Sequence, residues 1–306
     1  MREQEFTFPS ATGVCRISAS AYLPDGEAKN VLVIHHGMAE HRERYAGWIR
    51  FLCDGGTAVY MHDMASHGRS VCKNGETGWF GEEDGWQKLV EDFRTLVLRA
   101  REEQPGKPLT VMGHSMGSFL CRLYAARFPE DNPAGAIFMG TGGANSAAGA
   151  GLMAARTIAA LRGKHHKSKM LNSMAFGTYN KRFEGRTDFD WLTRDTEIVD
   201  RYVADPLCGF LFTVQGMADL VSANIASNAK NWYETLPAAL PVLLVSGEED
   251  PVGDYGRGVK DVADGLRETG HTNVTVKLYP GCRHEVLNET NRQQVMEDVR
   301  DWIDAL

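Results

Sequence analysis

The 306-residue sequence predicts an α/β fold in which a mostly parallel sheet is covered by helices on both faces. Short apolar runs alternate with longer amphipathic segments, which is the pattern of successive strand–helix units. Several of these runs are continuously apolar, as expected for strands buried on both faces. The composition, with 43% hydrophobic and 24% charged residues, is that of a globular protein with a sizeable core.

Strands and helices are expected in regular order over the first 140 residues. A helix over 44–53 ends at Asp54-Gly55-Gly56, which is a stop-and-turn signal. A longer helix over 83–103 has apolar residues at helical spacing and Pro105 just past its end. A third helix is expected over 115–128. The strands in this part are expected at 17–22, 31–34, 57–61, 109–112 and 134–139.

The strand–helix alternation stops at about residue 141 and resumes at about residue 237. The interruption begins with the small-residue stretch GTGGANSAAGAG and lacks strand signals. We interpret 141–236 as a mainly helical cap inserted over the end of the sheet. The core then comprises 1–140 and 237–306. Its second part is expected to contain strands at 242–245 and 274–279 and helices at about 255–268 and 289–304.

The segment Gly113-His114-Ser115-Met116-Gly117 fits the G-x-S-x-G pattern of a nucleophile turn. It follows the apolar run LTVM and precedes the helical run FLCRLYAARF. Small residues on both sides of Ser115 let neighbouring elements approach closely, so that its hydroxyl is presented at the end of the strand. The N-terminus of the following helix favours developing negative charge. This context predicts Ser115 as a nucleophile.

A serine hydroxyl needs a base to become a nucleophile, and the base needs an acid that fixes its tautomer. In this architecture, the acid and then the histidine each follow a late strand. Asp250 lies in such a place within SGEEDPV, and His284 lies in the next one within YPGCRHEV. Glu248 and Glu249 compete for the role of the acid, and Pro251 after Asp250 favours the aspartate.

The oxyanion of a tetrahedral intermediate needs two backbone N–H donors. One is expected from Met116, the residue after the nucleophile. The second is expected from the loop that ends the run VLVIHHGMAEH, where His36-Gly37 allows an unusual backbone turn and Met38 follows. We therefore assign the main-chain N–H groups of Met38 and Met116 to the oxyanion hole.

Five histidines near these loops raise the question of a metal site. No ligand-spaced set of them lies on one helix, and their placement in two loops near the nucleophile explains them better. We therefore expect no metal and no cofactor. These histidines stand at positions 35, 36, 41, 62 and 67.

Four segments together match the motifs of one known group of enzymes. They are His36-Gly37-Met38-Ala39-Glu40-His41 with Arg44-Tyr45, Asp63 with His67-Gly68-Arg69-Ser70, the GHSMG turn, and Asp250-Pro251-Val252 with His284. The chain resembles the monoacylglycerol lipase and lysophospholipase-like branch of α/β-hydrolases, related to serine aminopeptidases of the S33 type. The resemblance covers about 30–130 and 240–304. Ser66 and Ser118 stand where the group frequently has glycines.

This resemblance implies an α/β-hydrolase fold and a serine carboxylic ester hydrolase that acts on lipid-like or small acyl esters through an acyl-enzyme on Ser115. It also favours Asp250 as the acid. Glu40, Arg44 and Asp63 are expected to hold the oxyanion loop through a polar network rather than to contact the substrate. An amide-cleaving relative with the same triad is the first alternative, and a non-catalytic binding protein is the second.

The interrupted region is expected to form the roof of the substrate pocket. A basic cluster within it is interpreted as a solvated loop, with transient contact to a membrane surface as the alternative. Acidic cap residues, which an aminopeptidase would need near its pocket, are Glu184, Asp188 and Asp190. The apolar candidates are Leu152, Met153, Ile158, Leu161, Met170, Leu171, Met174, Phe176, Trp191, Phe210, Phe212 and Met217, and the basic cluster is Arg162, Lys164, His165, His166, Lys167 and Lys169.

The net charge, the apolar runs and the cysteines limit which binding partners and which cellular location are expected. The net charge of −7 argues against a nucleic-acid-binding surface, so a small-molecule acyl ester is the expected partner. No apolar run reaches the roughly 18 residues of a spanning helix, and the first residues do not form a secretory signal. Six dispersed cysteines suggest free thiols, and we therefore expect a cytoplasmic location.

Overall fold

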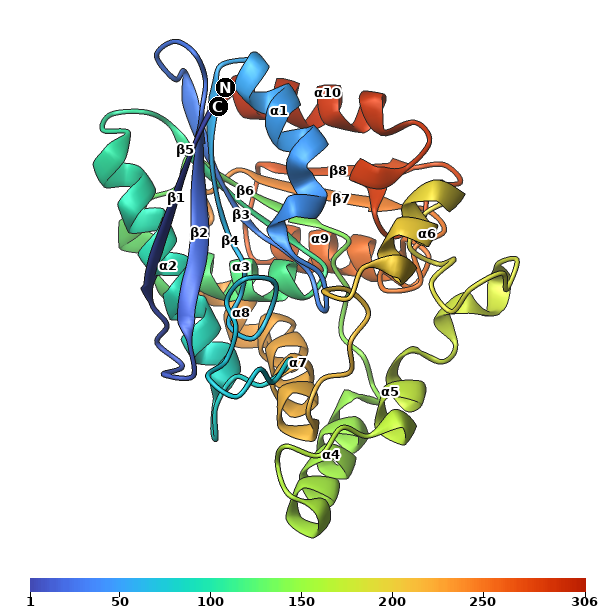
Figure 1. Ribbon diagram of the computed structural model, residues 1–306. Coiled ribbons are helices and arrows are strands. Elements are labelled where there is room, and N and C mark those ends of the chain that lie inside the picture. Colours follow the sequence, from blue (N-terminus) through green and yellow to red (C-terminus); the bar gives the residue numbers. More distant parts are fainter.

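The computed structural model describes residues 1–306, which form an eight-stranded sheet in the order β1-β2-β4-β3-β5-β6-β7-β8 (Figure 1). The first two strands pair antiparallel, and β2 is also antiparallel to β4, whereas the pairs from β4 to β8 are parallel. The strands are β1 Arg2–Pro9, β2 Arg16–Leu23, β3 Asn30–His35, β4 Thr57–His62, β5 Leu109–His114, β6 Gly135–Met139, β7 Val242–Gly247 and β8 Val274–Tyr279.

Helices cover both faces of this sheet, which confirms the predicted fold class (Figure 1). Along β3, Val31 and Val33 pack with one layer of helices, and Leu32 and Ile34 pack with the other layer. Since side chains alternate along a strand, a fully apolar run is needed to fill both layers. The first layer contains α2 Gly85–Glu103, α3 Met116–Arg127 and α9 Arg257–Glu268, and the second contains α1 Ala46–Asp54 and α10 Arg292–Asp304.

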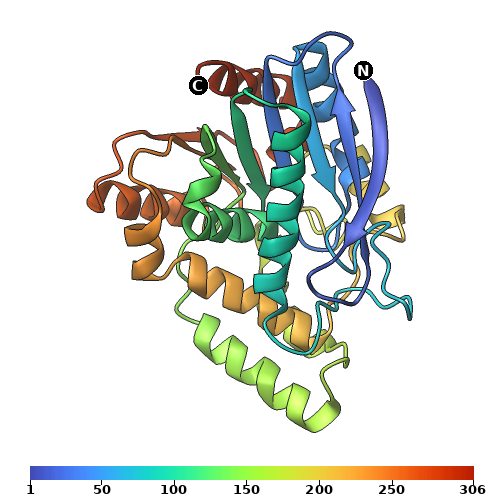
Figure 2. The ribbon, with the colours of Figure 1, turned by 90° about the vertical axis from the view of Figure 1, so that its left-hand side faces the viewer.

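The residues between β6 and β7 contain helices and no strand. Helix α7 packs on α2 and α3 of the first layer, and α4 packs on the outer side of α7, so that α4 lies farthest from the sheet (Figure 2). The short helix α8 also contacts α3. The helices of this insertion are α4 Ala148–Arg162, α5 Lys169–Phe176, α6 Thr196–Ala204, α7 Val214–Ser227 and α8 Lys230–Thr235.

Most predicted elements agree with the structure to within a few residues. One strand was not predicted, and one predicted helix is divided in two. The strand β1 was not predicted, because Arg2-Glu3-Gln4-Glu5 has no apolar residue and β1 is the exposed edge of the sheet. The helix expected over 44–53 is divided into a 3₁₀ turn at Arg42–Tyr45 and α1. No helix in residues 1–306 combines the length and the apolar character that a bilayer-spanning segment requires.

Candidate active site

Ser115 lies between β5 and α3, at the turn that the sequence predicted. Its backbone has φ 53° and ψ −122°, a conformation that side-chain-bearing residues rarely adopt. The turn is held by the Ser115 N–H, which donates to the Met139 carbonyl at the end of the neighbouring strand (2.9 Å), and by the Ser118 hydroxyl, which donates to the Ser115 carbonyl (2.5 Å). A strained residue held in this way is typical of functional sites.

The two glycines of the motif are required by space. A Cβ atom on Gly113 would lie 2.2 Å from the Gly117 carbonyl oxygen. A Cβ atom on Gly117 would lie 2.3 Å from the carbonyl oxygens of both His35 and His36. The start of α3 therefore lies directly against the ends of β5 and β3, which brings Ser115 next to the loop after β3.

His284 and Asp250 are brought together from the loops that follow β8 and β7. The Nδ1 atom of His284 lies 3.0 Å from each carboxylate oxygen of Asp250, and both residues are buried. Asp250 also accepts hydrogen bonds from the Ser246 hydroxyl and the Val252 N–H, each at 2.9 Å. Burial alone would raise the pKa of Asp250, but the charge of His284 and these hydrogen bonds keep the pKa below its ordinary value.

The competing carboxylates take no part in this pair. Glu248 is exposed and Glu249 is half-buried, and neither makes a side-chain hydrogen bond to His284. Of the three acidic residues of SGEEDPV, the structure therefore turns only Asp250 toward the imidazole.

Ser115 and His284 face the same cavity, which has a volume of about 920 Å³. Met38 and Met116 also line it, so this space brings together every predicted site residue except the fully buried Asp250. No hydrogen bond joins the Ser115 hydroxyl to His284 in this structure. Hydrophobic residues form 23 of the 41 that line the cavity, which makes it suitable for an apolar group.

The loop after β3 leaves the Met38 N–H free while it uses the N–H groups on either side. The Gly37 N–H donates to Glu40 Oε1 at 2.6 Å, and the Ala39 N–H donates to His67 Nε2 at 3.2 Å. Neither Met38 nor Met116 uses its N–H within the protein. Both residues border the cavity of Ser115, so their amides are available to an acceptor there.

The expectation that His36-Gly37 provides the unusual turn was wrong. The positive φ of this loop (51°) belongs to Ala39. Gly37 is needed for another reason, since a Cβ atom there would lie 2.7 Å from Glu40 Oε1 and 3.1 Å from the Ser115 Cβ.

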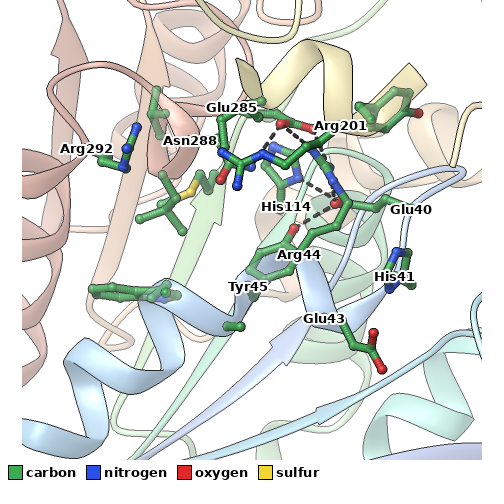
Figure 3. A pocket seen from close by; sticks show the side chains of 18 of the residues that line it. Glu40, His41, Glu43, Arg44, Tyr45, His114, Arg201, Glu285, Asn288 and Arg292 are labelled. Atoms are coloured by element: carbon green, nitrogen blue, oxygen red, sulfur yellow. Dashed lines mark hydrogen bonds and ion pairs between the residues drawn. The ribbon is translucent and has the colours of Figure 1, made fainter. Parts of the chain in front are cut away.

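A buried polar network lies behind the site, and its side chains point toward one another in Figure 3. Glu40 Oε1 accepts from the Tyr45 hydroxyl (2.9 Å) and lies 3.1 Å from His114 Nδ1, while Oε2 accepts from Arg44 at 2.7 Å. Arg44 makes a two-pronged pair with Glu285, with both contacts at 2.6 Å. The network therefore connects the loop after β3, the residue before Ser115 and the residue after His284.

The charges of this network compensate one another. Burial would raise the pKa of Glu40, but the hydrogen bond from His114 and the charge of Arg44 hold it well below the usual range. Burial would lower the pKa of His114, and Glu40 raises it above the ordinary value instead. Glu40 and Arg44 thus form the expected polar network, and Glu40 also lines the cavity that contains Ser115.

Asp63 also has the structural role expected of it. Its carboxylate accepts from the N–H groups of Arg42 and Arg69, each at 2.9 Å, and pairs with the Arg42 guanidinium at 2.5 Å. Ser66 has a positive φ (65°), a conformation that favours glycine. Its hydroxyl donates to the Glu76 carbonyl and accepts from the Trp79 N–H, which offsets the strain.

Sequence reasoning did not single out Glu285 or His114. Glu285 could have been noticed only as a carboxylate beside the predicted base, and His114 only as the variable residue of G-x-S-x-G. Glu285 binds Arg44 directly, and His114 is connected to Arg44 through Glu40. Arg44 lies 241 residues from Glu285 in sequence. The network also forms part of the wall of a second cavity of about 490 Å³, between α1, α6 and α10 (Figure 3).

Half of the apolar cap candidates lie at the active-site cavity, and the others do not. Phe212 belongs to the core, and the side chains of Met153, Leu161 and Met170 are exposed. Leu152 and Ile158 are partly buried and pack on the core. The candidates that line the cavity are Leu171, Met174, Phe176, Trp191, Phe210 and Met217.

The basic cluster is not simply a solvated loop, because three of its residues hold the insertion against the loop after β4. Lys164 donates to the Glu82 carbonyl, and Lys167 donates to the Thr77 hydroxyl, both at 2.8 Å. His165 stacks on Trp79 with ring centroids 3.8 Å apart and lies 2.7 Å from Glu76. These three side chains are used within the protein, which removes much of the support for an anionic-surface contact at this cluster.

The chain is similar to known lipases and esterases over nearly its whole length. A monoacylglycerol lipase of Mycolicibacterium smegmatis is 32% identical over 302 residues, which is 98% of this chain and 96% of that protein. The monoglyceride lipase of Mus musculus is 26% identical and covers 92% of this chain and 84% of its own length. A thermostable carboxyl esterase from Bacillus coagulans superposes with a TM-score of 0.93 at 30% identity, covering 100% of this chain and 99% of that one.

The family match spans both parts of the sheet and the insertion between them. The profile of the family described as "Serine aminopeptidase, S33" matches residues 26–291, which include the loop after β3, the turn at Ser115 and the loops of Asp250 and His284. The chain therefore belongs to the serine aminopeptidase S33 family of α/β-hydrolases, in its monoacylglycerol-lipase-like branch.

Proposed function

We propose that this protein is a serine hydrolase that cleaves lipid-like carboxylic esters, with Ser115 as the nucleophile. The lipases and esterases named above support the class of reaction. The single observation that carries the assignment of residues is the buried His284–Asp250 pair, because its histidine lines the same apolar cavity as the strained Ser115.

In the proposed mechanism, His284 accepts the proton of the Ser115 hydroxyl as the serine oxygen attacks the ester carbonyl carbon. Asp250 holds the Nδ1–H tautomer and stabilises the imidazolium that forms. The N–H groups of Met38 and Met116 bind the oxyanion. His284 then gives its proton to the leaving alcohol, and a water molecule, activated in the same way, releases the acid from Ser115.

The amide-cleaving alternative receives little support from the acidic residues of the insertion. A pocket for a substrate ammonium needs a free carboxylate. Glu184 is paired with Arg283 at 2.7 Å, and Asp190 accepts from the N–H groups of Arg186 and Thr187. Asp188 alone among the three lines the cavity without a hydrogen-bond or ion-pair partner, so it is the one acidic residue of the three that favours the alternative. A non-catalytic binding protein is also disfavoured, since such a protein has no need for a strained serine beside a buried histidine–aspartate pair.

The insertion is proposed as a cap that binds the acyl chain and contacts lipid transiently. Its inner residues Leu171, Phe176 and Phe210 face the cavity. Its outer surface, rather than the basic cluster, is the proposed lipid contact, because large hydrophobic side chains are exposed there. The six cysteines are free thiols, five of them buried, which supports the proposed cytoplasmic location.

Substrate class and nucleophile are tested together with a panel of p-nitrophenyl esters, monoacylglycerols, lysophospholipids and aminoacyl amides. We expect the wild-type chain to cleave monoacylglycerols and short esters far faster than amides. Ser115→Ala should lose on the order of 10⁶-fold in kcat, because it removes the nucleophile of a working triad. Ser146→Ala, which changes an exposed serine outside the cavity, is the matched control and should retain full activity. Wild-type rates in Ser115→Ala would refute the mechanism, whereas preference for amides would refute the substrate class.

A further inference from the structure

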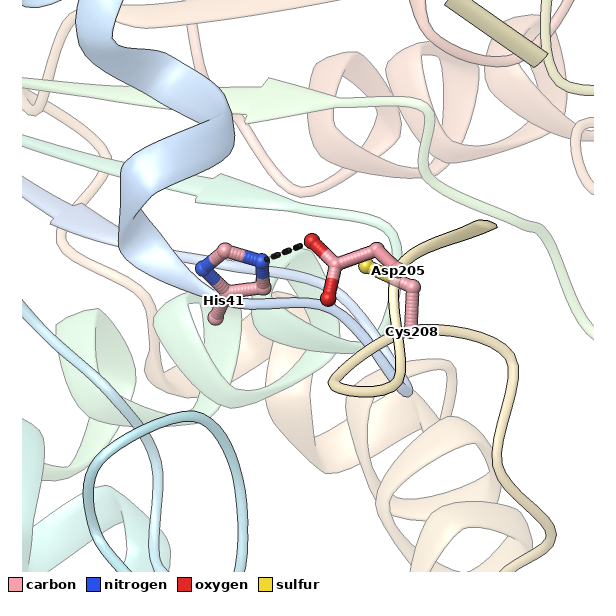
Figure 4. A group of neighbouring side chains, drawn as sticks. All are labelled: His41, Asp205 and Cys208. Atoms are coloured by element: carbon pink, nitrogen blue, oxygen red, sulfur yellow. Dashed lines mark hydrogen bonds and ion pairs between the residues drawn. The ribbon is translucent and has the colours of Figure 1, made fainter. Parts of the chain in front are cut away.

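Three side chains of metal-ligating type meet where the oxyanion loop contacts the insertion (Figure 4). His41 comes from the loop after β3, and Asp205 and Cys208 come from the loop after α6. The His41 Nε2 atom lies 2.9 Å from Asp205 Oδ2. One ligand atom from each of the three residues, the Cys208 sulfur among them, lies within 4.8 Å of the other two. None of the three takes part in the proposed catalytic mechanism.

We propose that His41, Asp205 and Cys208 form a binding site for one zinc-class divalent cation. An imidazole nitrogen, a carboxylate oxygen and a thiolate are ligands that Zn²⁺ accepts, and three protein ligands with one water complete a tetrahedral site. The mixed nitrogen, oxygen and sulfur set excludes Mg²⁺ and Ca²⁺, which prefer oxygen ligands alone. The spacing of the three atoms requires only small side-chain movements to surround one ion at about 2.0–2.3 Å.

The backbone around the site is already ordered. The Leu207 N–H donates to Asp205 Oδ1 at 2.8 Å, and the Cys208 N–H donates to the Asp205 carbonyl at 3.0 Å, so that the aspartate and cysteine lie on one tight turn. That turn is fixed to the oxyanion loop, because the Ala39 carbonyl accepts from the Gly209 N–H (2.9 Å) and from the Tyr202 hydroxyl (3.1 Å). Little conformational entropy then remains to be lost when an ion binds.

Water can reach the proposed metal site, and the positive charge beside it is balanced. His41 and Asp205 line the 490 Å³ cavity, and the Asp205 side chain is 31% exposed, so water can reach the fourth coordination position. Arg44 is the guanidinium that acts on both Asp205 and Cys208, and it would repel a cation. Its charge is balanced by the two carboxylates of Glu40 and Glu285.

Metal binding replaces one hydrogen bond with three stronger metal–ligand bonds. The hydrogen bond between His41 and Asp205 opens, bonds form from the metal to nitrogen, oxygen and sulfur, and the Cys208 thiol releases its proton to solvent. The ion would then join the oxyanion loop to the turn at 205–209. No step of ester cleavage passes through it, so the expected role is to fix the insertion against the loop that carries Met38.

The binding test uses the full chain, freed of metal by a chelator and titrated with Co²⁺ as a spectroscopic substitute for Zn²⁺. We expect one equivalent of Co²⁺ to bind with a thiolate-to-cobalt charge-transfer band and to be displaced by Zn²⁺. Cys208→Ser should abolish the band, and Asp205→Asn should weaken Zn²⁺ binding roughly tenfold or more. Cys15→Ser changes the thiol that is least buried and lies outside this cluster, and it should behave like the wild type.

A second measurement tests the proposed joining of the two segments. Saturating Zn²⁺ should raise the melting temperature of the wild type and slow amide hydrogen exchange in peptides covering 37–45 and 200–213, and both effects should be absent in Cys208→Ser. The proposal is overturned if the wild type shows no saturable band, or if folded Cys208→Ser retains it. Should Cys208→Ser fail to fold, wild-type Zn²⁺ affinity in Asp205→Asn overturns the proposal instead.

Discussion

At the scale of single residues, Glu40 is the side chain on which the arrangement of the site most depends. One of its carboxylate oxygens accepts the Gly37 N–H, which fixes the direction of the loop that carries the Met38 amide. The same oxygen orients His114, the residue before Ser115. The other oxygen shares Arg44 with Glu285. A single buried carboxylate thus sets the relative positions of the proposed nucleophile and one proposed oxyanion donor.

We expect Glu40→Gln to lower kcat about 10²-fold and to change KM little. A neutral amide keeps the shape but loses the charge that attracts the Gly37 N–H and His114, and small displacements of catalytic groups cost about that much. The control is Glu43→Gln, which removes a half-exposed carboxylate of the same loop that contacts only Arg69. Steady-state kinetics on a short soluble ester separate kcat from KM. A rise in KM at unchanged kcat would contradict this role for Glu40.

The residues of the candidate site were predictable to the extent that their chemistry is local. Ser115 was found from its pentapeptide and its strand–helix context, and His284 from its place after the last strand. The selection of Asp250 over Glu249 depends on which carboxylate the turn points inward, and Pro251 was only an indirect sign of that. The partnership of Arg44 with Glu285 joins residues 241 positions apart, and no local pattern encodes it.

At the scale of helices and strands, α4 and α5 carry four exposed large hydrophobic side chains, Met153 and Leu161 on α4 and Met170 and Met174 on α5. Their side chains are between 61% and 78% exposed. Helix α4 lies farthest from the sheet (Figure 2), so this surface can reach an interface without hindrance from the core. Exposed apolar side chains of this kind are a candidate lipid contact.

Replacing Met153 and Leu161 together by serine should weaken binding to zwitterionic phospholipid vesicles by about tenfold or more, since two apolar side chains would no longer leave water. Vesicle co-sedimentation measures the change, and turnover of a short soluble ester checks that the variant is folded. Val71→Ser is the matched control. Val71 is also 57% exposed, but it lies in the loop after β4, outside the insertion. Equal vesicle binding by wild type and double variant would rule out this contact.

The elements themselves divide into those with strong local signals and those without. Strands β3, β4, β5 and β7 are buried on both faces, so their continuous apolar runs identified them. The edge strand β1 needs no such run and was missed. The basic cluster around Lys164 was assigned to solvent because its acidic and aromatic partners, among them Glu76 and Trp79, come from a loop more than 80 residues earlier.

At the scale of the whole molecule, one buried carboxylate connects the first hairpin to the helical layer. Asp92 of α2 accepts from the Ser10 hydroxyl and the Ala11 N–H, both at 2.6 Å, in the turn between β1 and β2. Burial raises the pKa of Asp92 to about 7, although these hydrogen bonds act against the rise. The folded protein therefore holds a proton there that the unfolded chain releases above its ordinary pKa of 3.8.

This difference predicts how stability depends on pH. Where the folded state binds more protons, the free energy of unfolding falls as pH rises, here between about pH 4 and pH 7. Asp92→Asn removes the titrating group and can keep both hydrogen bonds, so its stability relative to wild type should increase by on the order of 2 kcal/mol from pH 5 to pH 7. Denaturant unfolding at both pH values measures this. Glu91→Gln, which changes a half-exposed neighbour on the same helix, should show no such trend.

The backbone of Ser115 has a consequence for the conformational stability of the folded chain. Its φ of 53° costs the native state of order 1–3 kcal/mol, which is a substantial part of the 5–15 kcal/mol that separates a typical native protein from its unfolded ensemble. The chain carries this cost whether or not substrate is present. Glycine would relieve the strain but would remove the hydroxyl that the proposed chemistry requires. The strain at Ser115 therefore cannot be removed without losing the proposed activity. Substitutions that raise the melting temperature would have to lie elsewhere in the molecule.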